Sequence, residues 1–332
     1  MEGKEMVDFA VLGAGAMGTA MSYLLASNNY DVVMWARRTE VADGINYKKV
    51  NAEYMPNVTL PKKVNATTDL KKCLESSKKI ILAIPSHGVY DLSLQLSKYR
   101  PSEKQWLSVV KGIDANVRRM ASEQIRDQLH AEKDQIAVLS GPNFAIEIVK
   151  NIPTIGVVGC TSKTTAAIFR DSLTTERFLI EVTNDIQGVE IGGILKNVGA
   201  IAIGLIDGLN LGDNTRGLIF SRYMQEALEI GTKIFKAKEQ TLLGPACLGD
   251  MIATAFSLKS RNRIIGLLAA KRITNIPKNT FISEGKSSTK IIQELAREHK
   301  ISVPVTDFAY DALSGTKPYV AFNNLWRHLG KE

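Results

Sequence analysis

The chain has 332 residues, of which 45% are hydrophobic and 23% are charged, and its formal net charge is +8. This length and composition are typical of a globular protein with two hydrophobic cores. The basic residues are dispersed, some of them in pairs, and form no stripe with interleaved aromatic side chains, so nucleic acid is not an expected partner. A modest positive field suits phosphorylated small molecules.

The three cysteines, Cys73, Cys160 and Cys247, include no Cys-x-x-Cys pair. Their number and spacing indicate neither a disulfide framework nor a zinc site, and they fit a reducing cytosol. The polar N-terminus predicts no signal peptide. The longest apolar region, 198–206, is too short for a bilayer span, which needs about 20 residues. We therefore expect a cytoplasmic protein without stable membrane insertion.

A glycine-rich turn follows the first predicted strand, residues 8–12, and precedes a predicted helix at 20–26. In this context Gly13, Gly15 and Gly18 match the dinucleotide-binding fingerprint. Its glycines permit a tight turn, close approach of a pyrophosphate, and close packing of helix on strand. The helix N-terminus would attract the phosphates. The sequence therefore predicts a dinucleotide site, with a glycine-rich turn that binds no ligand as the alternative.

The second predicted strand, residues 31–35, leads into Ala36, Arg37 and Arg38. In sites that prefer NAD, a carboxylate about 20 residues beyond the glycines bonds the ribose hydroxyls. Here that position has no carboxylate, and two guanidiniums are available to pair with a 2′-phosphate. This favours NADPH as the cofactor, with NADH as an alternative. The two arginines could also be solvated loop charges.

Short apolar runs alternate with amphipathic stretches as far as about residue 184, which predicts a Rossmann-type, doubly wound and largely parallel sheet. The further predicted strands are 79–84, 106–110, 135–139, 154–158 and 178–182. Three turns after these strands carry small or polar residues, at 85–87, 111–112 and 140–143. Ligands in such folds lie outside the carboxyl ends of the strands, so we expect these turns to line one crevice.

From Asp185 onward strand patterns nearly vanish, and helices are predicted at 185–209, 215–235, 261–270 and 288–299. We therefore expect an α/β dinucleotide-binding domain over 1–184 and an all-α substrate and catalytic domain over 185–332. Because pockets favour domain interfaces, the helical domain is expected to close over the crevice.

Lys196 lies in a predicted helix that is apolar nearly all round and should be buried. A buried ammonium is costly unless it is paired or its pKa is lowered, and a lysine with a lowered pKa can exchange a proton with a substrate oxygen. Alternatively, its ammonium reaches the surface. Asp250 begins another apolar helix and could orient Lys196, bond a substrate hydroxyl or cap its helix. With Lys196 as the electrophile no metal is expected.

Ser260, Arg261 and Asn262 begin a further predicted helix, with Ser260 as its N-cap. An arginine in the first turn of a helix is unfavourable beside the helix dipole unless an anion also binds there. The triplet therefore predicts a phosphate clamp, with a capped surface helix and a solvated arginine as the alternative. Lys111 directly follows a predicted strand and could reach cofactor or substrate.

Taken in order, these motifs resemble the NAD(P)-dependent sn-glycerol-3-phosphate dehydrogenases of the bacterial type, over about residues 8–315. The segments that carry the resemblance are Gly13–Gly18, Ala83–His87, Val110–Gly112, Ser140–Pro142, Gly192–Asn197, Gly249–Thr254, Ser260–Asn262 and Ser283–Gly285. One such motif would mean little, but this many in the correct order and spacing is specific for the family.

The resemblance implies a role for each matching residue. Lys196 matches the family's proton-transferring lysine, and Lys111 matches a lysine that touches both substrate and cofactor. Substrate contacts are implied for Gly141, Asn143, Asp250, Ser260, Arg261 and Asn262. Cofactor contacts are implied for Gly13, Gly15, Ala16, Met17, Gly18, Arg37, Arg38, Lys111, Ala145, Arg261, Ile282 and Glu284. The family reduces dihydroxyacetone phosphate to sn-glycerol 3-phosphate, which feeds phospholipid synthesis.

The chain departs from the family pattern at Asn143, where the family usually has Thr, and over 218–223 and 247–248. These departures leave open a paralogous NAD(P)-dependent dehydrogenase that acts on another phosphorylated polyol or ketose. A non-catalytic NADP-binding sensor is a second alternative, which the presence of Lys196 and Asp250 disfavours. A β-hydroxyacid or 6-phosphogluconate-type dehydrogenase would lack the Ser-Arg-Asn clamp. A homodimer is compatible with the sequence.

Overall fold

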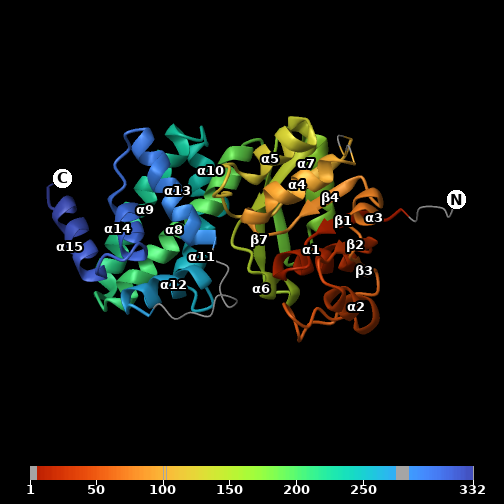
Figure 1. Ribbon diagram of the computed structural model, residues 1–332, viewed down its shortest axis with the longest axis horizontal. Coiled ribbons are helices and arrows are strands. Elements are labelled where there is room, and N and C mark those ends of the chain that lie inside the picture. The colour runs from red at the N-terminus through yellow and green to blue at the C-terminus, as the bar shows by residue number, and fades with distance from the viewer. Residues whose placement is uncertain (1–5, 100, 102, 274–283, 332) are drawn as a thin grey trace. The chain divides into compact units, whose positions relative to one another are not determined.

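The computed structural model describes residues 6–99, 101, 103–273 and 284–331, and the chain divides into two compact units (Figure 1). Unit 1 comprises the residues up to Val110 together with Arg119–Ile186. Unit 2 comprises Lys111–Arg118 and the residues from Gln187 onward. The segment that begins with Lys111, which the predicted boundary assigns to the first domain, thus clusters with the helical unit.

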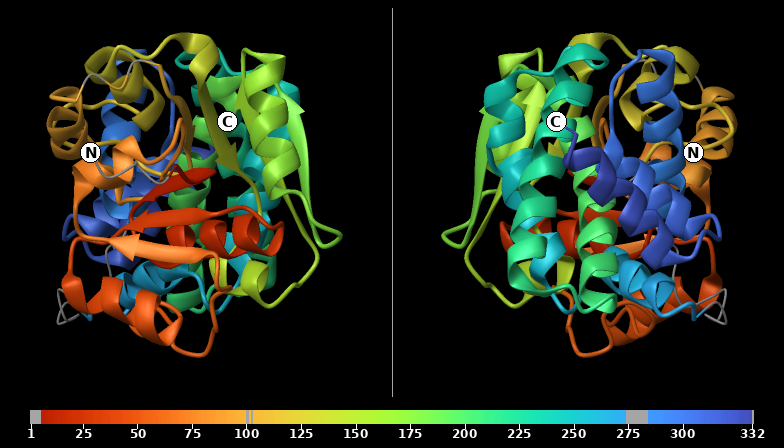
Figure 2. Two further views of the ribbon diagram at one scale, coloured as in Figure 1. Left: turned by 90° about the vertical axis from the view of Figure 1, so that its right-hand side faces the viewer. Right: turned by 90° about the vertical axis from the view of Figure 1, so that its left-hand side faces the viewer.

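Unit 1 is built on a sheet with the strand order β3-β2-β1-β4-β5-β6-β7-β8. The strands are β1 (Phe9–Leu12), β2 (Val32–Trp35), β3 (Val64–Thr67), β4 (Lys79–Leu82), β5 (Gln105–Ser108), β6 (Ile136–Ser140), β7 (Thr154–Cys160) and β8 (Phe178–Thr183). The pairings from β3 to β6 are parallel, in the order typical of dinucleotide-binding folds. The predicted fold class is confirmed, and β1 to β3 lie side by side in red and orange in Figure 2.

Two features of the sheet differ from the sequence prediction. The strand β3 was not predicted, because its alternating sequence is short and carries Asn65 on its exposed side. At the other end, β7 runs antiparallel to β6, and β8 is parallel to β7. A hydrophobic pattern identifies a strand without indicating its direction.

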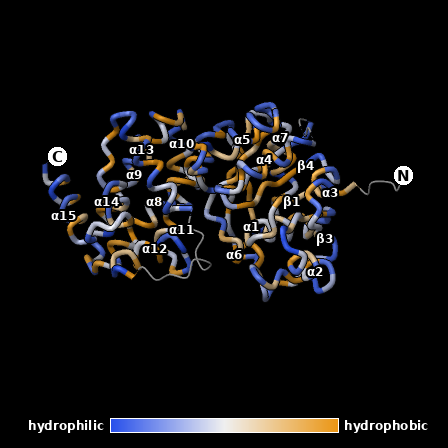
Figure 3. The backbone as a smooth tube through the Cα atoms, viewed as in Figure 1, coloured by the Kyte–Doolittle hydropathy of each residue, from blue (hydrophilic) through white to orange (hydrophobic). Residues whose placement is uncertain are grey.

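Helices cover both faces of the sheet because the strands are apolar on both sides. Along β1, Phe9 and Val11 belong to a core shared with α1, α2, α6 and α7, whereas Ala10 and Leu12 belong to a core shared with α3, α4 and α5. In Figure 3 hydrophilic residues predominate along α2, which has only two buried residues. The helices are α1 (Ala16–Ser27), α2 (Thr39–Lys48), α3 (Leu70–Glu75), α4 (Val89–Ser97), α5 (Ala121–Leu129), α6 (Ala145–Val149) and α7 (Lys163–Leu173).

Unit 2 is helical, and its described residues contain no strand, as predicted for the second half. Its helices are α8 (Ile186–Gly208), α9 (Gly212–Lys233), α10 (Glu239–Leu243), α11 (Asp250–Phe256), α12 (Arg261–Ala270), α13 (Glu284–Glu298), α14 (Pro304–Leu313) and α15 (Pro318–Leu329). A π-helical turn, Pro245–Gly249, leads directly into α11.

The helix α8 forms the core of unit 2. Its 23 residues make it longer than the apolar run that the sequence suggests, and long and apolar enough to cross a bilayer, but its most apolar 18-residue window is completely buried. Tyr223 of the neighbouring helix α9 donates a hydrogen bond of 2.6 Å to the carbonyl oxygen of Leu195. Its ring packs against Gly199, where a Cβ would lie 2.7 Å from the ring. This packing identifies α8 as a core helix.

Candidate functional site

The glycine-rich turn joins β1 to α1 in unit 1. Gly13 has a φ of +118°, and a Cβ there would lie 2.4 Å from the carbonyl oxygen of Ala83, just beyond β4. The turn therefore lies where the strand order reverses between β1 and β4, which is where doubly wound folds bind ligands. The buried amide of Asn51 fixes it, donating hydrogen bonds of 2.8 Å to the carbonyl oxygen of Ala14 and to Oγ1 of Thr19.

Gly15 and Gly18 are glycines for different physical reasons. A Cβ at Gly18 would lie 1.9 Å from the carbonyl oxygen of Gly13, so α1 can approach the turn only without a side chain there. A Cβ at Gly15 would meet nothing within 4 Å, and its φ of −78° suits any residue. No side chain caps α1, which leaves the first N–H groups, at Ala16 and Met17, for an anion. The turn thus fits a dinucleotide pyrophosphate.

Substituting these two glycines should separate folding from cofactor binding. Gly18→Ala is expected to lower the free energy of unfolding by about 1–3 kcal/mol, because its Cβ meets backbone. Gly15→Ala should change stability by less than about 0.5 kcal/mol and weaken NADPH binding about tenfold, because its Cβ enters the path of the pyrophosphate. Urea denaturation and NADPH fluorescence titration measure both. A Gly15→Ala variant that binds NADPH like the parent would contradict this placement.

The end of β2 carries Arg37 and Arg38, both exposed. Arg38 forms an ion pair with Glu53, and the two side chains are 48% and 42% exposed. No carboxylate follows β2 directly, but Glu53, from another loop, places one beside Arg38. Sequence distance alone could not show this pairing.

Three predicted contact residues follow β6 in unit 1. Gly141 has a φ of +131°, and a Cβ there would lie 2.8 Å from the carbonyl oxygen of Ile155. Asn143 is buried, and Ala145 begins α6. Because β1, β4, β5 and β6 are parallel, these residues lie at the same edge of the sheet as the glycine-rich turn. Ile282 lies outside the described residues, and Glu284 is the first residue of α13 in unit 2.

Three charged side chains meet in the interior of unit 2. Nζ of Lys111 lies 2.7 Å from Oδ2 of Asp250, and Nζ of Lys196 lies 3.2 Å from Oδ1 of the same carboxylate. Lys196 also donates a hydrogen bond of 2.9 Å to Oγ1 of Thr254, which donates one of 3.2 Å to Asp250. The side chains of Lys196 and Asp250 are only 10% and 4% exposed. Lys196 therefore does not extend into solvent, and the carboxylate of Asp250 pairs with the ammonium groups of both lysines.

Close packing of α8 against the π-helical turn brings these residues together. A Cβ at Gly192 would lie 2.7 Å from Cβ of Cys247, so the glycine lets α8 approach the turn that precedes Asp250. Lys196 follows Gly192 by four residues and therefore shares its helix face. Thr254 follows Asp250 by four residues on α11, which places its hydroxyl beside the same carboxylate.

The charges of this lysine–aspartate cluster do not balance. Burial lowers the pKa of Lys111 to about 8, against the opposing effect of Asp250, and the nearby Lys196 lowers it further. Burial alone would raise the pKa of Asp250, but Lys111 and Lys196 together hold it below its ordinary value. With both lysines protonated, two positive charges face one negative charge. The surplus cation suits an anionic or carbonyl-bearing ligand.

The predicted clamp is linked to this cluster through two amides. Ser260 accepts a hydrogen bond of 3.3 Å from the backbone N–H of Arg263, which confirms it as the N-cap of α12. Asn262 donates to Oδ1 of Asn197 over 2.7 Å, and Asn197 donates to the carbonyl oxygen of Lys111 over 3.0 Å. The predicted residues Lys111, Lys196, Asp250 and Asn262 thus belong to one network, while Arg261 begins α12 with an exposed side chain.

Backbone contact between α8 and α12 fixes the residues of the predicted clamp. A Cβ at Gly204 would lie 2.0 Å from the carbonyl oxygen of Arg263, and one at Gly266 would lie 2.1 Å from that of Ile201. The buried carboxylate of Asp207 on α8 also pairs with Arg263 over 2.7 Å. These contacts fix the first turn of α12 against the helix that carries Lys196.

Sequence reasoning missed three residues of these networks. Thr254 could have been found from its spacing of four residues from Asp250 on one helix face. Asn197 is a buried amide in an otherwise apolar helix, a pattern that signals a polar network. Asn51 precedes a turn and gives no comparable signal, because its partners are distant in sequence.

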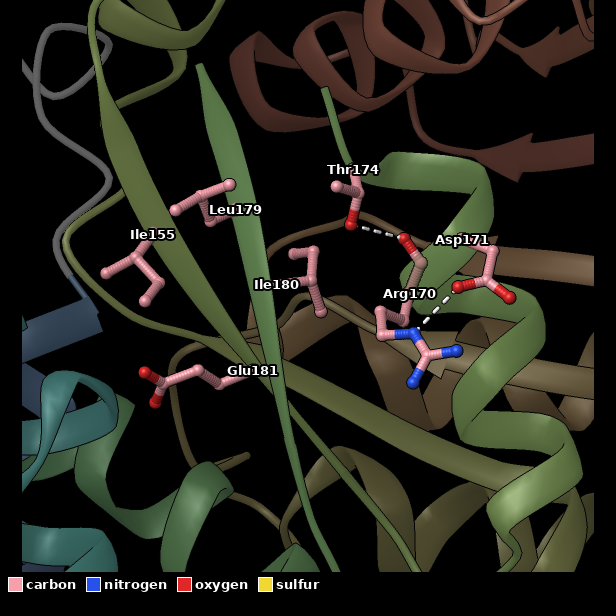
Figure 4. Close-up of a pocket in the computed structure, with 7 residues that line it drawn as sticks. All are labelled: Ile155, Arg170, Asp171, Thr174, Leu179, Ile180 and Glu181. Atoms are coloured by element: carbon pink, nitrogen blue, oxygen red, sulfur yellow. Dashed lines mark hydrogen bonds and ion pairs between the residues drawn. The ribbon is translucent and has the colours of Figure 1, made fainter. Parts of the chain in front are cut away.

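A cavity of about 520 Å³ lies on unit 1 between β7, β8 and α7 (Figure 4). Leu179 and Glu181 project from one side of β8 and Ile180 from the other, and Arg170 is hydrogen-bonded to Asp171 over 2.7 Å. None of the predicted site residues lines it. In the part of the chain that the structure describes, no group of three or more His, Cys, Asp or Glu side chains is suited to hold a metal ion.

Comparison with known proteins identifies the family. The model of the NAD-dependent glycerol-3-phosphate dehydrogenase N-terminus matches residues 8–166, and that of the C-terminus matches residues 185–322. The chain is 37% identical over 306 residues to the glycerol-3-phosphate dehydrogenase [NAD(P)+] of Corynebacterium kroppenstedtii, covering 91% of this chain and 92% of that protein. It is 35% identical over 305 residues to the enzyme so named in Clostridium tetani, covering 91% and 86%.

A solved structure supports the same family assignment. The crystal structure of glycerol-3-phosphate dehydrogenase from Coxiella burnetii matches with a TM-score of 0.88 and 29% identity, over 97% of this chain and 99% of that one. A ketopantoate reductase from Ralstonia eutropha, at 14% identity and a TM-score of 0.60, shares the fold alone. With both family models matched and the relatives covered nearly end to end, the chain belongs to the NAD-dependent glycerol-3-phosphate dehydrogenase family.

Proposed function

We propose that this chain reduces dihydroxyacetone phosphate to sn-glycerol 3-phosphate with NADPH, reversibly, with NADH as a second cofactor. The observation that supports this most is the buried cluster in which Lys111 and Lys196 share Asp250. Such a cluster offers a proton donor beside a surplus positive charge, which a phosphorylated ketone requires. We further propose a cytoplasmic enzyme, acting as a homodimer, that supplies phospholipid synthesis.

The proposed cofactor contacts are those that the family resemblance implies. Gly13, Gly15 and Gly18, with the N–H groups of Ala16 and Met17, hold the pyrophosphate, and Arg37 and Arg38 pair with the 2′-phosphate. Lys111, Ala145, Arg261, Ile282 and Glu284 complete the contacts. When bound, the reduced nicotinamide supplies the hydride.

Lys196 has the central role in the proposed reaction. Its ammonium donates a hydrogen bond to the substrate carbonyl oxygen, polarises the carbonyl, and passes its proton to the oxygen as the alcohol forms. Asp250 holds Lys196 in place and balances its charge, and Thr254 accepts the second hydrogen bond that fixes the ammonium. Lys111, Gly141 and Asn143 contact the substrate. No metal is required, because the ammonium serves as the electrophile.

The substrate phosphate is proposed to bind at the start of α12. Arg261 and Asn262 supply donors, Ser260 caps the helix, and the helix N-terminus adds its partial positive charge. An NADPH-oxidation assay with a panel of phosphorylated ketones, dihydroxyacetone phosphate first, tests the proposal. Turnover with another phosphorylated ketone in place of dihydroxyacetone phosphate would change the proposed substrate. If no ketone is turned over, the alternative of a non-catalytic cofactor-binding sensor would be favoured.

Arg261→Ala is expected to raise the KM for dihydroxyacetone phosphate about 10- to 100-fold, because a charge-assisted hydrogen bond to the phosphate is lost. The matched control is Lys271→Ala, which removes one exposed positive charge just past the opposite end of α12. Steady-state kinetics compare the two variants. An unchanged KM in the Arg261 variant would place the phosphate elsewhere.

The KM for the phosphorylated ketone is expected to rise as the pH rises through about 8. Below that pH Lys111 is protonated and the cluster carries its surplus positive charge, whereas above it the charge is lost and anion binding weakens. Lys111→Arg keeps its charge at all these pH values, so it should flatten the rise. Kinetics from pH 6.5 to 9.5 on both proteins measure the effect. A rise of equal size in the arginine variant would rule out Lys111 as its source.

A further inference from the structure

The loop that pairs with Arg38 is built onto the cofactor turn. Asn51, whose amide fixes the glycine-rich turn, accepts a hydrogen bond of 2.8 Å from the backbone N–H of Met55. Met55 is buried, with 2% of its surface exposed. Residues 51–55 therefore form a tight turn anchored at both ends, and Glu53 lies at its apex. Asn51 therefore holds both turns, the glycine-rich turn through its side-chain amide and the turn that carries Glu53 through its backbone carbonyl oxygen.

The Glu53 carboxylate occupies the guanidinium that the cofactor phosphate requires. A 2′-phosphate is bound best when arginine offers two parallel N–H groups to it. In this structure Arg38 presents its guanidinium to Glu53. A 2′-phosphate bound at Arg38 would compete with this carboxylate for the guanidinium and lie close to a negative charge, whereas NADH, which has no 2′-phosphate, would meet neither cost.

We propose that Glu53 is a specificity-determining residue, which competes with the 2′-phosphate for Arg38 and so narrows the difference in affinity between NADPH and NADH. This inference rests on the proposed function in one respect, the placement of the 2′-phosphate at Arg38. Both side chains are about half exposed, so solvent screens the pair and the effect on affinity is modest.

The test is the ratio of the Kd of NADH to the Kd of NADPH, measured by fluorescence titration at low ionic strength to limit screening. Glu53→Gln removes the charge and is expected to raise this ratio about two- to fivefold, through tighter NADPH binding with little change for NADH. The matched control is Glu176→Gln, which removes one exposed negative charge elsewhere on unit 1 and should leave the ratio unchanged.

Arg38→Gln shows whether the effect passes through the guanidinium. Arg38→Gln should lower this Kd ratio. In the double variant, Glu53→Gln should not raise the ratio above that of Arg38→Gln alone. The inference is overturned if Glu53→Gln leaves the ratio at its parental value while Arg38→Gln lowers it, or if the rise persists without Arg38. If Arg38→Gln itself has no effect, the proposed site of the 2′-phosphate fails. Dihydroxyacetone phosphate turnover, measured separately, tests the proposed reaction independently of either result.

Discussion

Replacing Lys196 with methionine is expected to lower kcat for ketone reduction about 10²- to 10⁴-fold, the usual contribution of a positioned general acid. The ammonium is the proposed source of the proton that the forming alcohol requires. Methionine has a similar length and no proton to give. The Kd of NADPH should be unchanged, because the proposed contacts of the cofactor do not include Lys196. Stopped-flow turnover and fluorescence titration measure the two quantities.

The same substitution should not destabilise the protein by more than about 1 kcal/mol. Without Lys196 the buried cluster is a one-to-one pair of Lys111 and Asp250, which is better balanced than the parent cluster. Thr254 keeps its hydrogen bond to Asp250. A loss of activity in Lys196→Met would then come from the loss of the proton donor and not from unfolding.

The matched control is Lys233→Met on α9, whose side chain is 64% exposed and which should retain full activity. A Lys196→Met enzyme that turns over within tenfold of the parent would remove Lys196 from the mechanism.

Much of the fold could be predicted from local patterns. The predicted strand at 178–182 and the predicted helix at 261–270 correspond to β8 and α12 almost residue for residue, because a period of two or 3.6 residues is a local property. The glycine-rich turn was recognisable because each glycine in its spacing meets a local requirement of the turn, of the pyrophosphate or of the helix that follows it. The antiparallel direction of β7 was not, since it depends on how the chain returns to the sheet.

The candidate site could be predicted as a set of residues but not as an arrangement. Lys196 was conspicuous because a cation in an apolar helix needs a partner, yet no spacing indicates that Asp250, 54 positions away, is that partner. Their meeting depends on Gly192 and the π-helical turn. Glu53 gave no signal, because a glutamate in a polar loop is ordinary until Arg38 is seen beside it.

Asp250→Asn is expected to abolish turnover and to lower the free energy of unfolding by about 3–5 kcal/mol at pH 7, because it removes the carboxylate that two buried ammoniums share. The amide keeps the size of the side chain, so packing is preserved and the loss is electrostatic. Urea denaturation and the NADPH-oxidation assay measure the two effects. A variant as stable as the parent would mean that water reaches and solvates both lysines.

The sign of the pH dependence tests the electrostatic explanation. In the folded Asp250→Asn protein the pKa of Lys111 should fall below the parent's value of about 8, because the carboxylate that raises it is removed. Above that lowered pKa the unfolded chain binds more protons than the folded one, so the stability of the variant rises with pH, whereas the parent begins the same rise only near pH 8. The deficit relative to the parent protein should therefore shrink as the pH rises to about 8 and stay constant above it. A deficit that is already constant below pH 8 would indicate lost packing.

A triple variant separates the electrostatic cost of the buried charges from the cost of altered packing. Combining Asp250→Leu with Lys111→Met and Lys196→Met replaces all three charges by apolar side chains of similar size. Because the replacement of a buried ionic cluster by apolar groups is often neutral or stabilising, we expect this protein to be at least as stable as the parent and inactive. That outcome would mean that the buried charges are retained for turnover at a cost to stability. A triple variant as unstable as Asp250→Asn would instead assign the charges a structural role.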